Sequence, residues 1–287
     1  MKQTTKVKIK YILKQGMLFG IYNFGTILPK RHPPVLLYHS IDESGSCIST
    51  KPSEFARQMS LIKENGYITL SLGEMVKIWK EGVSYPDKAV VLTFDDGLQN
   101  NYEVAFPILK KFGFTATIFL TTDYIGKRST WDRKRGIPEL PMLTWEMIRE
   151  MDRSKIDFQS HTATHPHLLQ ISYERIKYEI ISSRAVIEEH LGKRSNIFCY
   201  PYAEYDERII NVLKGEGVIA ATAEHPDKEN LYEIRRVSSA HLATDLAFKT
   251  ALAGGFPLFY SCKYLAEKLW SSRSYNNISC SREKEAG

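Results

Sequence analysis

Apolar runs rich in β-branched residues alternate along this chain with segments whose apolar positions follow a helical period. The runs have the length of buried strands, and they lie at 35–39, 89–94, 115–120, 156–160, 196–200 and 217–222. The helical segments lie at 54–65, 102–112, 145–151, 173–191 and 206–215. Because strand, helix, strand repetition with right-handed crossovers builds a parallel sheet, the pattern predicts an α/β fold.

Two adjacent carboxylates, Asp95 and Asp96, directly follow the run at 89–94. Charged groups at the end of a buried strand are costly to desolvate, which favours a functional role. Neighbouring residues of an extended segment point to opposite sides, so the pair does not suit two acids that flank one glycosidic bond. One carboxylate can instead bind a cation while the other acts as a general base. A turn that merely ends the strand is the alternative interpretation.

Two histidines four residues apart, His161 and His165, follow the run at 156–160. This spacing serves a metal ion if the segment curls through about one turn. Pro166 disfavours a long helix continuing past the pair, and no Glu follows His161, so the helical zinc-protease motif is absent. An acidic pair and a histidine pair, each at the carboxyl end of a strand, together predict a metal site.

Three motifs in this order resemble the polysaccharide deacetylases of carbohydrate esterase family 4, the NodB-homology family. They are Thr93 to Gly97, His161 to His165, and Tyr200 to Tyr202, and the resemblance covers about 33–245. The segments Leu37 to Ser40, Phe55 to Gly66 and Phe198 to Tyr202 resemble the branch that deacetylates poly-N-acetylglucosamine. The resemblance implies a distorted, incomplete (β/α) barrel and removal of N-acetyl groups from N-acetylglucosamine-type sugars of a polysaccharide or glycan precursor.

Position by position, the resemblance makes Asp95 the general base and makes Asp96, His161 and His165 the ligands of a divalent metal. Zinc is the expected ion, with cobalt or nickel as alternatives. Two imidazoles and one carboxylate leave coordination positions open, as a hydrolytic site requires. A backbone N–H near Tyr202 is expected to share the developing oxyanion.

The general acid and the arginine that pairs with the base depart from the family's commonest pattern. The late histidine that usually supplies the acid has only a poor counterpart in His241, so His39, at the end of the run at 35–39, is preferred. Cys199 occupies the region where many members carry the arginine, and its own default interpretation is a buried free thiol. The arginine's role passes to Arg235 or Arg236, only one of which can face the site; we prefer Arg236 and group it with the substrate-binding residues.

A long connection at 121–144 contains Trp131 among five basic residues. Trp131 is expected, with Tyr202, to contact the sugar, and the basic residues suit an anionic polymer or lipid phosphate. A solvated loop without function is the alternative. Two other functions would fit the motifs: an O-acetyl esterase acting on acetylated polysaccharide, and a catalytically silent carbohydrate-binding protein.

Length and composition suit a single barrel domain in a chain of 287 residues. The resemblance implies that the catalytic domain lies at 31–255. The net charge of +6 is too modest to predict a nucleic-acid partner. Residues 1–30 are basic and apolar, which suits either peripheral contact with a membrane surface or a helix packed on the barrel. Residues 256–287 are expected to form a helix and a polar tail. The family favours the cell envelope, whereas four cysteines without a Cys-x-x-Cys pair, which indicate no disulfide framework, favour a reducing compartment.

Overall fold

A computed structural model of the chain describes residues 16, 20–21, 32–224, 226 and 229–255. Its central feature is a parallel sheet with the strand order β10-β9-β8-β7-β6-β5-β1-β11, and β4 pairs with β5 beside this path. These strands are β1 (Val35–Tyr38), β4 (Ile68–Leu70), β5 (Ala89–Phe94), β6 (Ala116–Leu120), β7 (Ile156–Ser160), β8 (Ile197–Cys199), β9 (Ala220–Ala223), β10 (Ile234–Arg235) and β11 (Val237–Ser238). A small separate sheet pairs β2 (Ser40–Ile41) with β3 (Ser49–Thr50).

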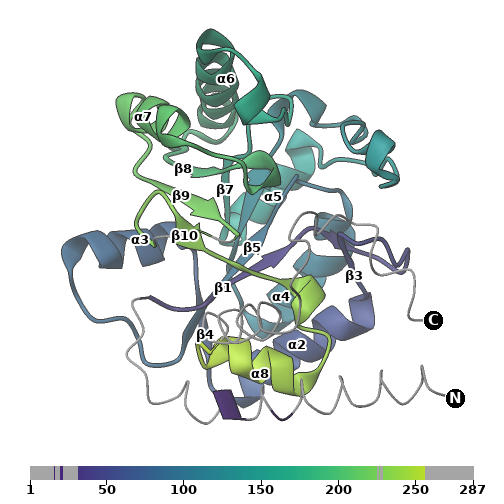
Figure 1. Cartoon of the computed structure of the whole chain (residues 1–287). Coiled ribbons are helices and arrows are strands. Elements are labelled where there is room, and N and C mark those ends of the chain that lie inside the picture. The colour runs from purple at the N-terminus through teal and green to yellow at the C-terminus, as the bar shows by residue number, and fades with distance from the viewer. Residues whose placement is uncertain (1–15, 17–19, 22–31, 225, 227–228, 256–287) are drawn as a thin grey trace, which may run out of the picture.

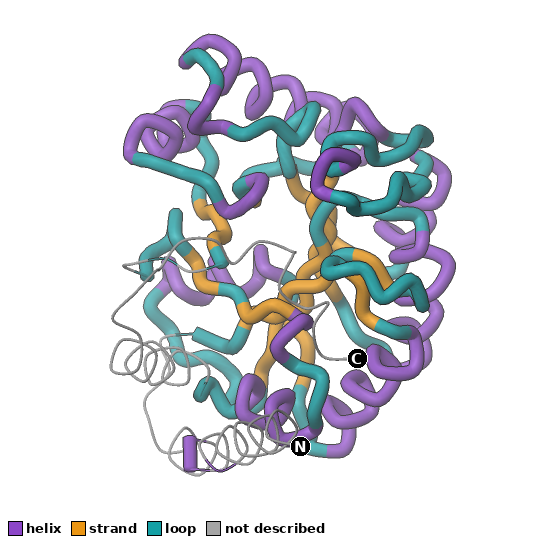
Figure 2. Tube along the Cα trace, turned by 45° about the vertical axis from the view of Figure 1, so that its right-hand side comes forward, coloured by secondary structure: helices purple, strands orange, loops and turns teal. Residues whose placement is uncertain are grey.

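The sheet curls into a nearly closed barrel because one chain segment bonds to both of its ends. β10 pairs with β9, and β11, which follows after a single residue, pairs with β1. The residue between the two short strands is Arg236. The predicted distorted (β/α) barrel is therefore confirmed, and Figure 2 shows helices outside the strands.

Helices connect most of the strands and cover the outside of the barrel (Figure 1). They are α2 (Pro52–Glu64), α3 (Leu72–Glu81), α4 (Phe106–Phe112), α5 (Trp145–Arg153), α6 (Tyr173–Leu191), α7 (Glu207–Gly215) and α8 (Asp245–Leu252). The helix expected at 102–112 is divided into a π-helical turn, Asn101–Ala105, and α4. Pro107 contributes to this division because it has no N–H to donate to the preceding turn. Helices α3 and α8 are additional to the helical segments that the sequence pattern predicts.

The register of the strands aligns their carboxyl ends at one rim of the barrel. Tyr38 pairs with Phe94, and the N–H of Asp95 donates to the Tyr38 carbonyl at 2.9 Å. On the other side, Leu120 pairs with Ser160, and the N–H of His161 donates to the Leu120 carbonyl at 2.9 Å. Residues that directly follow β1, β5 and β7 consequently lie at the same level, which is where a barrel gathers its functional side chains.

Buried apolar side chains of the strands and of helix α2 stabilise this rim. All residues of β5 and β6 are buried, as expected for parallel strands covered on both faces. Tyr38 and Phe94 stack with ring centroids 5.4 Å apart, and Phe55 of α2 meets the Tyr38 ring edge-on at 5.2 Å. Burying such rings contributes about 1.5–3 kcal/mol each, so β1, β5 and α2 form a firm support for the residues that follow.

The terminal segments expected at 1–30 and 256–287 lie almost entirely outside the described residues. Of the first segment, Ile21 is described and is buried in the main apolar cluster. Within the described part of the chain, no helix combines the length and the apolar character that crossing a bilayer requires.

Cys47 is disulfide-bonded, so the expectation that no cysteine is paired is wrong for this residue, whereas Cys199 is free and buried.

Candidate active site

Three side chains with metal-binding atoms converge at the rim: Asp96, His161 and His165. Asp96 Oδ1 lies 3.6 Å from His161 Nε2 and 3.4 Å from His165 Nε2, and all three residues are at most 6% exposed. Donor atoms around a tetrahedral zinc ion lie about 3.3 Å apart when each bond is about 2.0 Å long. The spacing and the donor types of this triad therefore fit a divalent metal.

The chain adopts strained backbone conformations to bring these donors together. Among the described residues other than glycine, those with a positive φ include Asp96 at 72°, Thr162 at 70° and His165 at 58°. The segment from His161 to His165 curls as expected, but it is an irregular loop rather than a helical turn. Thr162 Oγ1 accepts a hydrogen bond from the His165 N–H at 2.9 Å and stabilises the curl. Unfavourable left-handed residues concentrated at one place are typical of functional sites.

Burial has opposite consequences for the two kinds of ligand in the triad: it keeps the imidazoles neutral and disfavours the ionised carboxylate. Burial lowers the pKa of both histidines, so their imidazoles are neutral at pH 7 and have lone pairs available. Burial also raises the pKa of Asp96, to about 7, with Asp95 adding to the rise and His161 opposing it. The His161 ring is oriented because its Nδ1 lies 2.9 Å from the Cys199 carbonyl oxygen, which leaves Nε2 facing Asp96.

Asp95 lies beside the triad and is held by a buried guanidinium. Arg236 donates from Nη1 to Oδ1 at 2.6 Å and from Nη2 to Oδ2 at 2.7 Å, and Arg236 is only 2% exposed. Burial alone would raise the pKa of Asp95, but the charge and hydrogen bonds of Arg236 hold that pKa well below the ordinary carboxyl range. Asp95 is therefore ionised throughout the physiological pH range.

The structure pairs Arg236, and not Arg235, with Asp95. Arg235 turns away and donates from Nη2 to the Pro226 carbonyl at 3.0 Å. The substrate contact that we expected for Arg236 needs correction, because its side chain is buried and both of its terminal nitrogens are committed to Asp95. Arg236 lies in the break between β10 and β11.

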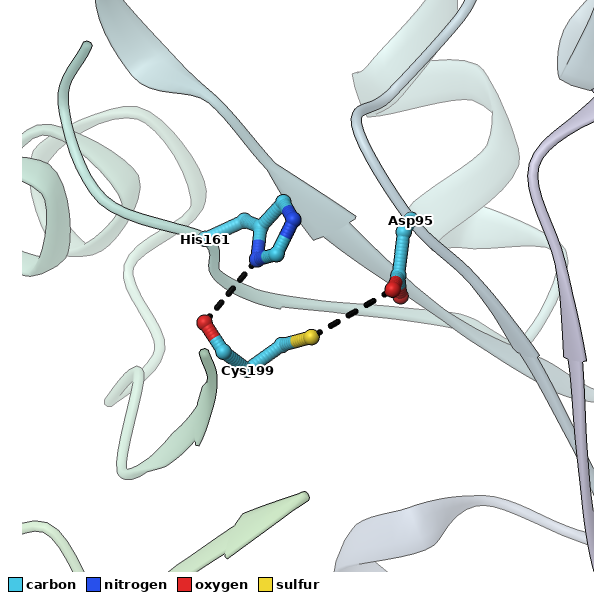
Figure 3. Close-up of side chains that lie close together, drawn as sticks. All are labelled: Asp95, His161 and Cys199. Carbon is cyan, nitrogen blue, oxygen red and sulfur yellow. Dashed lines mark hydrogen bonds between the residues drawn. The ribbon is translucent and has the colours of Figure 1, made fainter. Parts of the chain in front are cut away.

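Cys199 contacts both Asp95 and His161 (Figure 3). Its Sγ donates to Asp95 Oδ2 at 3.4 Å and accepts from Arg236 Nη2 at 3.1 Å, while its carbonyl faces the His161 ring. Burial raises the pKa of Cys199, so the side chain stays a thiol. The sequence predicted only a buried thiol here, because nothing local to residue 199 indicates its neighbours across the barrel.

His39 faces Asp95 from the end of β1. Its Nε2 lies 3.9 Å from Asp95 Oδ2, and its side chain is 26% exposed, so it is open to a bound molecule. Burial lowers the pKa of His39, with Asp95 opposing and Arg236 adding to the shift. The alternative acid, His241, lies in the turn Ser239–His241 that follows β11.

Comparisons with known proteins agree with this geometry. The profile of the family described as "Polysaccharide deacetylase" matches residues 82–221. This chain belongs to that family. YxkH of Bacillus subtilis, whose name assigns it to the polysaccharide deacetylases, is 29% identical over 208 residues, covering 71% of this chain and 70% of that protein. The poly-beta-1,6-N-acetyl-D-glucosamine N-deacetylase of Staphylococcus epidermidis is 28% identical over 218 residues, covering 71% of each.

A solved structure supports the same assignment. The Streptococcus pyogenes deacetylase PplD, in complex with acetate, matches with a TM-score of 0.63 and 25% identity, covering 72% of this chain and 92% of that chain. This polysaccharide deacetylase family member is accordingly a hydrolase.

Aromatic side chains border the site of this family member. The Trp131 ring stacks on the His165 ring with centroids 4.8 Å apart, and the Tyr202 ring meets His165 edge-on at 4.6 Å. Two further groups contact the Tyr202 ring. The His167 ring stacks on it with centroids 4.0 Å apart, and the Arg135 guanidinium carbon lies 5.3 Å from the Tyr202 ring centroid. One ring face of Trp131 is thus occupied by His165, which limits how a sugar can stack there.

A hollow beside Asp96 is lined largely by apolar groups of the connection at 121–144 and of neighbouring loops. The lining residues are Ile48, Asp96, Leu98, Ser129, Trp131, Asp132, Ile137 and Pro138. Asp132 was not singled out from the sequence, although it is adjacent to Trp131. Part of the connection, from Ser129 to Pro138, therefore lines the hollow beside Asp96.

Proposed function

We propose that this protein removes N-acetyl groups from N-acetylglucosamine-type sugars of a polysaccharide or a glycan precursor. The observation that carries the proposal is the convergence of two sets of groups at one rim of the barrel. The first set, Asp96, His161 and His165, fits a divalent metal, with zinc as the expected ion. The second set is an ionised carboxylate, Asp95, with His39 opposite it. Metal-assisted hydrolysis of an amide uses both sets.

The metal, when bound by Asp96, His161 and His165, would polarise the acetyl carbonyl and acidify a water molecule. Asp95 would take a proton from the attacking water as its oxygen bonds to the acetyl carbon. The carbon–nitrogen bond would then break, and His39 Nε2 would deliver a proton to the leaving amine. A backbone N–H near Tyr202 would stabilise the negative charge on the acetyl oxygen.

The substrate class is supported by the site and by the relatives. The hollow beside Asp96 has apolar side chains among its lining residues, which suits an acetyl methyl group, and Trp131 borders it. The relative from Staphylococcus epidermidis is named for poly-beta-1,6-N-acetyl-D-glucosamine. An O-acetyl esterase would use the same groups, but its leaving alkoxide needs less assistance from a general acid.

The proposal is tested by acetate release from two substrates, an oligomer of β-1,6-linked N-acetylglucosamine and acetylated xylan. We expect zinc-loaded protein to release acetate from the amino sugar and to leave the xylan ester largely intact. Release from xylan alone would replace the proposal with the O-acetyl esterase. Release from neither substrate, despite bound zinc, would favour a carbohydrate-binding protein without this activity.

Replacing His39 by alanine should change the pH dependence of the reaction. A general acid acts only while protonated, so kcat/KM of the wild type should fall as pH rises through the His39 pKa. Because burial lowers that pKa, the fall should begin below the ordinary histidine value of about 6.5. The His39→Ala variant should be slower and should lack this basic limb. An unchanged profile, measured on the same amino-sugar oligomer, would remove His39 as the acid.

Zinc binding to the metal-free protein should weaken as pH falls below about 7. The pKa of Asp96 is raised to about 7, so below this pH the carboxyl group must release its proton before it can bind the cation. The histidines, with lowered pKa values, begin to compete with protons only at more acidic pH. Release of a single proton limits the loss of affinity to about tenfold per pH unit. Calorimetry in buffers of different ionisation enthalpy measures this proton release, and a pH-independent affinity would contradict the expectation.

A further inference from the structure

We propose that Glu179 is a positioning residue that holds the metal-binding loop between His161 and His165 in its binding conformation. Glu179 lies in the second turn of α6, outside the site described above, and its side chain is completely buried. A buried carboxylate is destabilising unless hydrogen-bond donors or a counter-ion offset the loss of its hydration. Glu179 therefore requires such partners. The inference rests on the metal site of the proposed function.

The carboxylate of Glu179 accepts hydrogen bonds from the middle of the loop. Oε2 accepts from the N–H groups of Ala163 at 2.9 Å and of Thr164 at 2.8 Å. Oε1 accepts from Thr164 Oγ1 at 2.7 Å and from Arg175 Nη2 at 2.6 Å. The loop belongs to no helix or strand, so its buried N–H groups depend on this side chain for partners.

A second contact, one helical turn further along α6, ties the helix to the strand before the loop. Ser183 Oγ lies 2.6 Å from Ser160 Oγ, and Ser160 is the last residue of β7. Residues four apart on a helix share one face, so Glu179 and Ser183 present a two-point clamp. The clamp fixes the start of the loop through Ser160 and its centre through Ala163 and Thr164.

His165 depends on this clamp more than His161 does. The His161 ring has a hydrogen-bond partner in the Cys199 carbonyl, whereas His165 Nδ1 is buried with no hydrogen-bond partner among the described residues. A metal-binding histidine is ordinarily oriented by a bond from its second ring nitrogen. Without that bond, His165 is positioned by its backbone, which has a positive φ, and by ring contacts. Through its bonds to the N–H groups of Ala163 and Thr164, Glu179 fixes the backbone conformation that leads into His165.

The test is the zinc affinity of metal-free protein, measured by competition with a chromophoric chelator. Glu179→Asp keeps the charge but is one methylene too short to reach both N–H groups, and Glu179→Ala removes the contact. Both should bind zinc about tenfold or more weakly, the usual effect of losing an outer-shell partner. Glu179→Gln should retain most of the affinity, because its amide oxygen can still accept both N–H bonds. Glu189→Gln, an exposed position on the same helix, should match the wild type.

The outcomes separate this inference from the proposed function. If Glu179→Asp and Glu179→Ala bind zinc like the wild type while their melting temperatures fall, Glu179 has a structural role only and the inference is wrong. If Glu179→Ala yields no folded protein, Glu179→Asp decides alone. A wild type that binds no zinc would overturn the metal site and this inference together. Zinc binding that depends on Glu179 without any acetate release would leave the inference intact and contradict the proposed activity.

Discussion

Replacing Asp95 by asparagine should reduce kcat/KM on N-acetylglucosamine oligomers by about 10²–10⁴-fold, the usual contribution of a general base. Asp95 is an ionised carboxylate whose Oδ2 lies 3.9 Å from His39 Nε2. Asparagine has the same shape but cannot accept a proton at neutral pH. Zinc content should stay that of the wild type, because Asp96, His161 and His165 remain.

A surface variant, Asp87→Asn, provides the matched control, since Asp87 is exposed and precedes β5, whereas Asp95 follows that strand. It should retain the wild-type rate. Full activity in Asp95→Asn would remove Asp95 as the base. Loss of zinc together with activity would show that Asp95 supports the metal instead.

Replacing Arg236 by methionine should lower the free energy of unfolding by about 3–5 kcal/mol at neutral pH, because it leaves a buried carboxylate without its counter-ion. The wild-type pair is bidentate, and Arg236 is 2% exposed, so no solvent replaces the lost contact. The neighbouring variant Arg235→Met loses only a bond to a backbone carbonyl and should cost about 0.5–1.5 kcal/mol. Urea denaturation of both variants measures the difference.

The pH dependence of this effect has a defined sign. In the wild type the pKa of Asp95 is depressed, so its stabilising contribution is present above the unfolded carboxyl pKa of about 3.9 and is lost as pH falls through the folded pKa. Without Arg236, burial dominates and raises the pKa of Asp95, so the carboxyl group becomes neutral at a higher pH. The difference in the free energy of unfolding between wild type and Arg236→Met should therefore become smaller on mild acidification. A constant gap would contradict the assigned pairing.

The sequence predicted those parts of the site that depend on strand ends. Asp95, Asp96 and His161 follow buried apolar runs, and parallel strands align such positions at one rim, so their convergence could be inferred before the structure. Alternation along a short strand also limited the partner of the base to Arg235 or Arg236. The irregular loop that brings His165 to Asp96 could be inferred only as a curl, because its shape depends on Glu179.

Other features escaped prediction because their cause lies far away in the chain. In the sequence, Glu179 looks like an ordinary helical residue. Its contacts with the loop are known only from the packing of α6 in the structure. Cys199 likewise contacts Asp95 and Arg236 across the barrel. By contrast, the start of α3 does have a local signal in the sequence, because Ser71 and Glu74 have the spacing of a capping box and form one.

The central claim is that Asp96, His161 and His165 hold a metal on which amide hydrolysis depends. It is tested most directly by adding zinc stepwise to chelated protein and following acetate release from the N-acetylglucosamine oligomer, with His161→Ala in parallel. We predict no release before zinc, a rise that saturates near one equivalent per chain, and no comparable rise in the variant. Undiminished release from the chelated protein, or equal recovery in His161→Ala, would contradict the account.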